Sequence, residues 1–89
     1  MTSREVTIVN KLGLHARAAT RLVNCASAFE CELWINNGEK SVNSKSIMGV
    51  LTLAACKGTE LTIEADGEDE REAVETVINL INDRFGEDE

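Results

Sequence analysis

The hydrophobic residues of this 89-residue chain switch repeatedly between a two-residue period and a helical period, and this switching restricts the fold more than any other feature. A two-residue period is typical of a strand with one buried face, whereas apolar residues three or four apart indicate a helix. The periods predict seven elements in the order strand, helix, strand, strand, helix, strand, helix. Their expected ranges are residues 4–9, 16–27, 30–36, 40–43, 47–53, 59–65 and 69–84.

Short polar signals support this order. Asn37-Gly38 favours a tight hairpin, because both residues accept positive φ, so the strands on either side should pair antiparallel. Residues 47–53 could form a strand or a helix on pattern alone, but Ser46 is a good N-cap and favours a short helix. The final residues, Gly86-Glu87-Asp88-Glu89, are expected to form a frayed acidic tail.

These elements suit an α+β fold with two layers, an open-faced sandwich of a four-stranded, mostly antiparallel sheet and three helices on one face. At this length the chain is expected to form one domain over residues 1–89, and its 43% hydrophobic content allows a modest core. No apolar run is long enough to span a bilayer, and residues 1–5 lack the apolar stretch of a signal peptide. We therefore expect a cytoplasmic protein with no membrane insertion.

The three cysteines, Cys25, Cys31 and Cys56, form an odd set without a C-x-x-C spacing. This pattern argues against a disulfide framework and against a zinc site, and we expect all three to be small buried hydrophobic residues. A small metal or redox protein that uses Cys25, Cys31 and His15 is an alternative with weak support, because the spacing fits no known ligand set.

The net charge of −7 is unevenly distributed: residues 1–57 carry +3 and residues 58–89 carry −10. An acidic half would be repelled by nucleic acid, and the chain has no interleaving of basic and aromatic residues, so nucleic acid is not an expected partner. An acidic protein that docks on the mildly basic half is a better match.

That half contains His15, the only histidine, which is expected at or next to the N-cap of the first helix. The first-turn N–H groups of a helix have no intrahelical partners and form an anion site. Arg17 adds a planar donor fork suited to phosphate, and Arg21 lies one turn further along the basic surface. This arrangement suits nucleophilic chemistry at a ring nitrogen, although a lone histidine before a helix is more often only a capping or solvent-facing residue.

Three motifs show a resemblance to a known family. They are Gly13-Leu14-His15-Ala16-Arg17, Ser44-Lys45-Ser46-Ile47-Met48-Gly49 and Lys57-Gly58-Thr59. Together they resemble the histidine-containing phosphocarrier (HPr) family of the bacterial phosphoenolpyruvate-dependent phosphotransferase system, and the resemblance spans residues 5–85. It implies the same open-faced sandwich, with the second helix near the start of the first. The residues that would then form a docking surface around His15 are Arg21, Lys45, Ile47, Met48 and Leu51.

The resemblance also implies a function. Enzyme I would phosphorylate His15 at Nδ1 from phosphoenolpyruvate, and His15 would pass the phosphoryl group to a histidine of an EIIA-type protein. The chain lacks a nucleotide loop, a metal-spaced cluster and a second histidine, so no cofactor is expected. We expect a covalent transfer intermediate rather than an autonomous enzyme. A monomer suits a carrier that shows one face to successive partners.

Three features resemble the nitrogen-branch carriers (NPr) more than the sugar-transport HPr proteins: the Asn10-Lys11-Leu12 lead-in, Ala18 and the acidic ending. We therefore predict a regulatory nitrogen-branch carrier. The alternatives are a sugar-transport HPr and a noncatalytic HPr-like module that docks a regulator.

Ser46 is a second candidate site. As an N-cap it is worth about 1 kcal/mol. By resemblance, Lys45-Ser46-Ile47-Met48-Gly49 is the segment that HPr kinase/phosphorylase modifies in some bacteria. A phosphate at a helix N-terminus would leave the fold intact, so its effect would fall on docking.

Ala18 stands where the family most often has proline, and it supplies a backbone N–H that proline lacks. We predict that this residue causes no loss of phosphoryl acceptance at His15. The test compares the transfer rates of the wild-type protein and the Ala18→Pro variant, and a much lower rate in the wild type would contradict the prediction.

Overall fold

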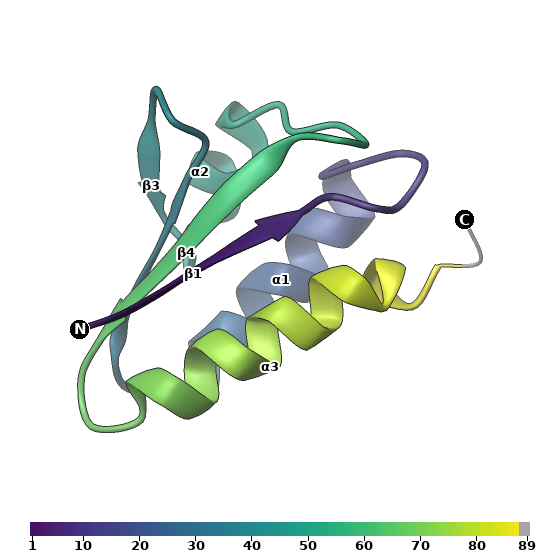
Figure 1. The fold of residues 1–89 in the computed structure, drawn as a ribbon. Helices are drawn as coiled ribbons and strands as arrows, with labels where there is room; N and C mark the ends of the chain where they lie inside the picture. Colours follow the sequence, from purple (N-terminus) through teal and green to yellow (C-terminus); the bar gives the residue numbers. More distant parts are fainter. Residues whose placement is uncertain (88–89) are drawn as a thin grey trace.

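A computed structural model describes residues 1–87 of the chain (Figure 1). All seven predicted elements are present in the predicted order, and a 3-10 turn follows the last helix. The elements are β1 (Thr2–Thr7), α1 (Ala16–Ser27), β2 (Glu32–Asn36), β3 (Ser41–Asn43), α2 (Ile47–Thr52), β4 (Glu60–Asp66), α3 (Glu70–Asn82) and η1 (Arg84–Gly86).

The four strands form one sheet in the order β1-β4-β2-β3, and every neighbouring pair is antiparallel. The Asn37-Gly38 hairpin is confirmed: the Asn37 side chain accepts hydrogen bonds from the N–H groups of Glu39 and Lys40, and β2 pairs with β3. Helices α1 and α3 lie side by side beneath the sheet (Figure 1). The predicted α+β open-faced sandwich is therefore confirmed.

The core lies between the sheet and the helices. Alternate strand residues face it, as the two-residue period predicted, and the helical stripes of α1 and α3 close it from below. Fully or almost fully buried members include Leu33, Ile35, Leu61, Ile63, Leu22, Val77 and Ile81. Because the charged side chains of α1 lie on its other face, Arg17 and Arg21 remain exposed beside the buried stripe.

The short helix α2 begins where Ser46 predicted it. The Ser46 hydroxyl accepts a hydrogen bond from the Gly49 N–H at 3.2 Å, which satisfies one of the unpaired donors of the first turn. Among residues 1–87, no helix combines the length and the apolar character needed to cross a membrane.

The expectation that all three cysteines are buried is wrong for Cys56. Cys31 is buried and Cys25 is half-buried, but Cys56 is exposed because it lies in the loop before β4. Burial, followed by a hydrogen bond to Asp69, raises the pKa of the Cys31 thiol to about 11. In the described part of the chain, no three His, Cys, Asp or Glu side chains lie close enough to hold a metal ion.

Asp69 ties the start of α3 to the segment before β2. Its carboxylate accepts hydrogen bonds from the N–H groups of Glu30 at 2.9 Å and Cys31 at 3.0 Å. The bond from Glu30 is the main reason that the pKa of Asp69 is lowered.

This lowered pKa predicts a specific acid sensitivity. A carboxyl group with a depressed folded pKa stabilises the protein above its unfolded pKa, about 3.9 for Asp, and that contribution is lost as the pH falls through the lower folded value. The free energy of unfolding should therefore fall on acidification below about pH 4, and it should fall less steeply for Asp69→Asn. Urea denaturation across a pH series measures this, with Asp66→Asn as the exposed control; parallel curves for the two variants would contradict it.

Candidate functional site

The loop before α1 is held in place by the backbone of residues 55–56. Gly13 has a φ of +66°, and a Cβ atom at this position would lie 2.4 Å from the Ala55 carbonyl oxygen. The next residue, Leu14, is buried and donates its N–H to the same carbonyl at 2.9 Å. Glycine is therefore required here both for its conformation and for its size.

His15 is the N-cap of α1, as predicted. Its backbone is extended, and its carbonyl accepts the first helical hydrogen bond, from the Ala19 N–H at 2.8 Å. Its Nδ1 accepts a hydrogen bond from the Arg17 N–H at 3.3 Å, which is long and therefore weak. The Nδ1 lone pair thus points at the first-turn amides of the helix.

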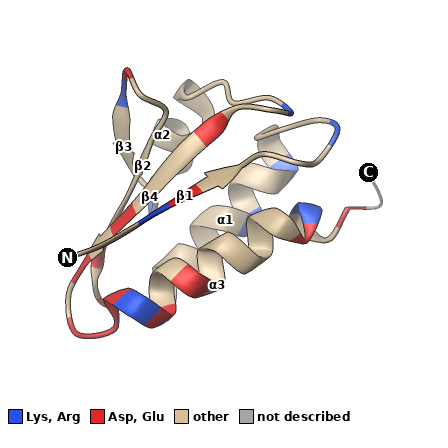
Figure 2. Ribbon diagram, viewed as in Figure 1, with Lys and Arg blue, Asp and Glu red and all other residues tan. Residues whose placement is uncertain are grey.

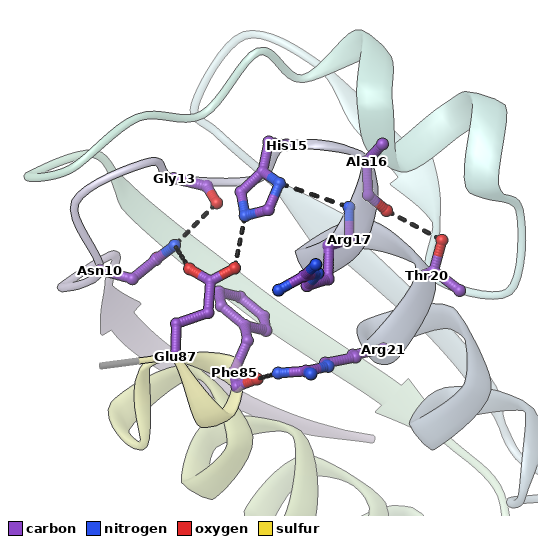
Figure 3. Close-up of polar contacts among 9 residues, drawn as sticks. All are labelled: Asn10, Gly13, His15, Ala16, Arg17, Thr20, Arg21, Phe85 and Glu87. Atoms are coloured by element: carbon purple, nitrogen blue, oxygen red, sulfur yellow. Dashed lines mark hydrogen bonds and ion pairs between the residues drawn. The ribbon is translucent and has the colours of Figure 1, made fainter. Parts of the chain in front are cut away.

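The other ring nitrogen contacts a residue that the sequence did not indicate. His15 Nε2 lies 2.5 Å from Glu87 Oε2 (Figure 3). Because Nδ1 accepts a hydrogen bond, the ring proton belongs on Nε2, which donates it to the carboxylate. The side chains of His15 and Glu87 are only 30% and 13% exposed, so this contact is largely shielded from water.

Asn10 is the third residue of this hydrogen-bonded group, with His15 and Glu87. Its side chain is fully buried, and its Nδ2 donates to the Gly13 carbonyl at 2.9 Å and to Glu87 Oε1 at 3.0 Å. Burial alone would raise the pKa of Glu87, but the hydrogen bonds from Asn10 and His15, together with the positive charge of Arg21, outweigh burial and lower it. Glu87 is therefore a carboxylate at neutral pH.

The expected frayed tail is wrong for Gly86 and Glu87, whereas Asp88 and Glu89 lie outside the described residues. Arg84, Phe85 and Gly86 all have positive φ, at 56°, 55° and 78°, and they turn the chain back towards α1. Phe85 is fully buried, and its carbonyl accepts a hydrogen bond from the Arg21 guanidinium (Figure 3). The only sequence signal for this turn was an isolated aromatic residue followed by glycine.

An open pocket of about 930 Å³ lies in front of His15, and Lys11, Leu12, Arg17, Arg21 and Glu87 line it with the histidine. The loops at this end of the molecule carry blue segments in Figure 2, whereas the turn between β4 and α3, at the other end, is red. The fold thus turns the charge asymmetry of the sequence into a basic pocket around His15.

The remaining residues predicted for the docking surface differ from one another in exposure and in position. Ile47 and Met48 are 39% and 69% exposed on α2, and Leu51 is partly buried. Lys45 does not reach the pocket, since its Nζ donates to the carbonyl of Phe29, beyond the last residue of α1. Helix α2 therefore starts near the far end of α1, and the chain that follows it, at Ala55, contacts the loop before His15.

Comparison with known proteins identifies this arrangement. The family model described as the phosphorylation site of the PTS HPr component matches residues 2–83. The chain belongs to the HPr family. It is 48% identical over 89 residues to the phosphocarrier protein HPr of Neisseria meningitidis serogroup A, and 49% identical over 90 residues to that of Pseudomonas aeruginosa; each comparison covers all of both chains.

A solved structure of another HPr protein has the same fold as this chain. HPr-C-His from Thermoanaerobacter tengcongensis superposes with a TM-score of 0.96 at 40% identity, over all of both chains. The predicted resemblance is thus confirmed at the level of the HPr family of phosphocarriers. The match to the family model ends at residue 83, so it includes His15 but not its partner Glu87.

Proposed function

We propose that His15 accepts a phosphoryl group at Nδ1 from phospho-Enzyme I, with phosphoenolpyruvate as its source, and passes it to a histidine of an EIIA-type protein in the cytoplasm. One observation carries this proposal: Nδ1 faces the first-turn amides of α1, where the Arg17 N–H donates to it, while Nε2 faces the Glu87 carboxylate. A nitrogen with a lone pair is a nucleophile, and the amides form the anion site that a phosphoryl group needs.

The surroundings suit both states of such a carrier. The lone pair attacks phosphorus, a P–N bond forms at Nδ1, and the donor leaves with the electron pair of the bond that breaks. The weak 3.3 Å bond from the Arg17 N–H is given up at little cost. The guanidinium of Arg17 and the helix amides then face the new negative charge.

The same pocket favours an acidic partner. Arg21 and Lys11 add positive charge beside His15, and Ile47, Met48 and Leu51 supply apolar surface on α2. We propose this combined surface for docking of Enzyme I and of the EIIA-type protein. Lys45 would contribute only at its far edge, where its ammonium is already held by the Phe29 carbonyl.

The relatives also bear on the branch of the phosphotransferase system in which the chain acts. The relatives that resemble the chain over its full length are named phosphocarrier protein HPr, which favours a general HPr over the predicted nitrogen-branch carrier. The features that led to the nitrogen-branch prediction are the Asn10-Lys11-Leu12 lead-in, Ala18 and the acidic ending, and none of them is a full-length match. We therefore propose a general HPr and keep the nitrogen branch as the second candidate.

The test is the intact mass of the protein after incubation with phosphoenolpyruvate and Enzyme I, with His15→Ala as control. We expect one phosphoryl group, labile in acid and stable in alkali, that is absent from the variant. The phosphorylated protein is then offered to sugar-branch and nitrogen-branch EIIA proteins, and the faster acceptor identifies the branch. No modification, with Enzyme I active on another carrier, would overturn the proposal and favour the noncatalytic docking module.

Ser46 provides a separate prediction about regulation by an HPr kinase/phosphorylase. Ser46→Ala should lower the free energy of unfolding by about 1 kcal/mol through loss of the cap, with unchanged phosphoryl acceptance. Ser46→Asp should weaken binding of Enzyme I, because it adds a negative charge beside the exposed Ile47 and Met48. Calorimetric titration measures the binding, and equal affinity of Ser46→Asp and wild type would count against a regulatory site.

A further inference from the structure

The contact between the Glu87 carboxylate and His15 affects both steps of the carrier cycle, in which His15 first accepts and then donates the phosphoryl group. This inference rests on the proposed function. We propose that Glu87 and Asn10 are positioning residues that keep a proton on Nε2 of His15 throughout the cycle. Nδ1 is then a nucleophile when it is empty and part of a neutral leaving group when it is phosphorylated.

The geometry leaves Glu87 little freedom. Both carboxylate oxygens are used, Oε2 by His15 Nε2 at 2.5 Å and Oε1 by Asn10 Nδ2 at 3.0 Å (Figure 3). Asn10 cannot flip its amide, because both Nδ2 hydrogens are engaged and the flip would turn Oδ1 towards the Gly13 carbonyl and the carboxylate. The side chains of Asn10 and Glu87 therefore fix each other.

Asn10 is also an unfavourable residue for stability at this buried position. It is fully buried, and its Oδ1 has no hydrogen-bond partner within residues 1–87. A buried acceptor without a partner destabilises a protein, so packing alone would favour an apolar side chain. Asn10 nevertheless contributes two N–H donors: one binds the Gly13 carbonyl in the loop before His15, and the other binds Glu87.

In the first half of the cycle, the Nδ1 lone pair forms the bond to phosphorus as the bond between phosphorus and its donor breaks. The ring keeps its Nε2 proton and gains positive charge, which the adjacent carboxylate offsets. An imidazole without such a partner also populates the form with the proton on Nδ1, and in that form Nδ1 has no lone pair for the attack.

In the second half, the bond between Nδ1 and phosphorus breaks as the acceptor histidine attacks, and its electron pair returns to Nδ1. Because Nε2 still carries its proton, the ring leaves as neutral imidazole. A ring that had lost this proton would have to leave as an imidazolide anion, which is a much poorer leaving group. No proton is gained or lost in either half.

The anchoring of Glu87 is built into the fold. Phe85, two residues earlier, is fully buried, and its carbonyl is held by Arg21 of α1. The same helix therefore presents Nδ1 at its N-terminus and fixes the segment that carries the partner of Nε2.

The first experiment needs no phosphoryl chemistry. ¹⁵N NMR of the histidine ring in the unphosphorylated protein should show a single form with the proton on Nε2. In Glu87→Gln the amide has one acceptor oxygen for two donors, so both tautomers should appear; Asn10→Ala should shift the ratio in the same direction. A Glu75→Gln variant removes an equal charge from the exposed face of α3 and should match the wild type. A single Nε2–H form in both Glu87→Gln and Asn10→Ala would overturn the inference.

The second experiment measures transfer out of the phosphorylated protein. The single-turnover rate from phosphorylated Glu87→Gln to an EIIA-type protein should be at least about tenfold below that of wild type, since carboxylates that fix a catalytic histidine's tautomer contribute up to about 10⁴-fold. The affinity for the EIIA-type protein, measured separately, should not fall, because the variant removes a negative charge from a pocket proposed to dock an acidic partner. Equal transfer rates would overturn the inference even if the tautomer ratio shifts. Wild-type protein that takes up no phosphoryl group would instead refute the proposed function.

Discussion

Replacing Phe85 with alanine lowers the free energy of unfolding by about 3–5 kcal/mol, the usual loss for a large aromatic side chain removed from a core. Phe85 is fully buried and is the largest of the completely inaccessible side chains. Its own φ is +55°, and that of Arg84 before it is +56°, so its burial also holds two residues in a conformation that non-glycine residues seldom adopt. The variant should lose the turn as well as the contacts.

Guanidinium chloride denaturation measures this loss, and Phe29→Ala is the matched control. Phe29 is only partly buried at the edge of the core, so its truncation should cost clearly less. Release of the turn should also free Glu87, so the His15 ring of Phe85→Ala should show both tautomers while that of Phe29→Ala should not. Similar losses of stability in the two variants would contradict the assigned role of Phe85.

The second large effect is expected at Gly13. Gly13→Ala combines a positive φ, which costs an L-residue about 1–2 kcal/mol, with a Cβ atom placed 2.4 Å from the Ala55 oxygen and 2.7 Å from the Cys56 Cα. Both neighbours are backbone atoms, so relief requires the loop to move, at about 1–3 kcal/mol for an overpacked site. Because this loop ends at His15, phosphoryl acceptance should fall together with stability.

Gly38→Ala separates the two contributions. Gly38 also has a positive φ, +96°, but a Cβ atom there would meet nothing within 4 Å. It should therefore lose only the conformational part of the free energy and keep the full rate of phosphorylation. Thermal denaturation and the rate of phosphorylation by Enzyme I compare the two variants. If Gly13→Ala were no less stable than Gly38→Ala, the close approach to Ala55 would not be a constraint.

Local patterns predicted most of the fold. The predicted and observed bounds of the first helix coincide at residues 16–27, because its apolar stripe begins directly after a good cap. Asn37-Gly38 and Ser46 were reliable for the same reason: each acts through hydrogen bonds to residues at most three positions away. These signals require no knowledge of tertiary structure.

The parts that could not be predicted depend on distant contacts. Glu87 was assigned to a frayed tail because nothing near it in the sequence indicates that Phe85 enters the core or that Asn10 lies 77 positions away at hydrogen-bond distance. Lys45 was expected to join the docking surface, but its ammonium donates to the Phe29 carbonyl in the connection between α1 and β2, 16 positions away. Cys56 was expected to be buried on residue type alone, and its position in a loop outweighs that preference.

The separation of His15 from Glu87 also affects the order in which the site is made. During synthesis, the residues of the loop and of α1 leave the ribosome long before residue 87, since domains are made from the N-terminus at about 5–20 residues per second. A nascent chain that ends before Phe85 can form the cap of α1 but has no carboxylate to hold Nε2. The contact between His15 and Glu87 therefore forms only when the last turn has docked.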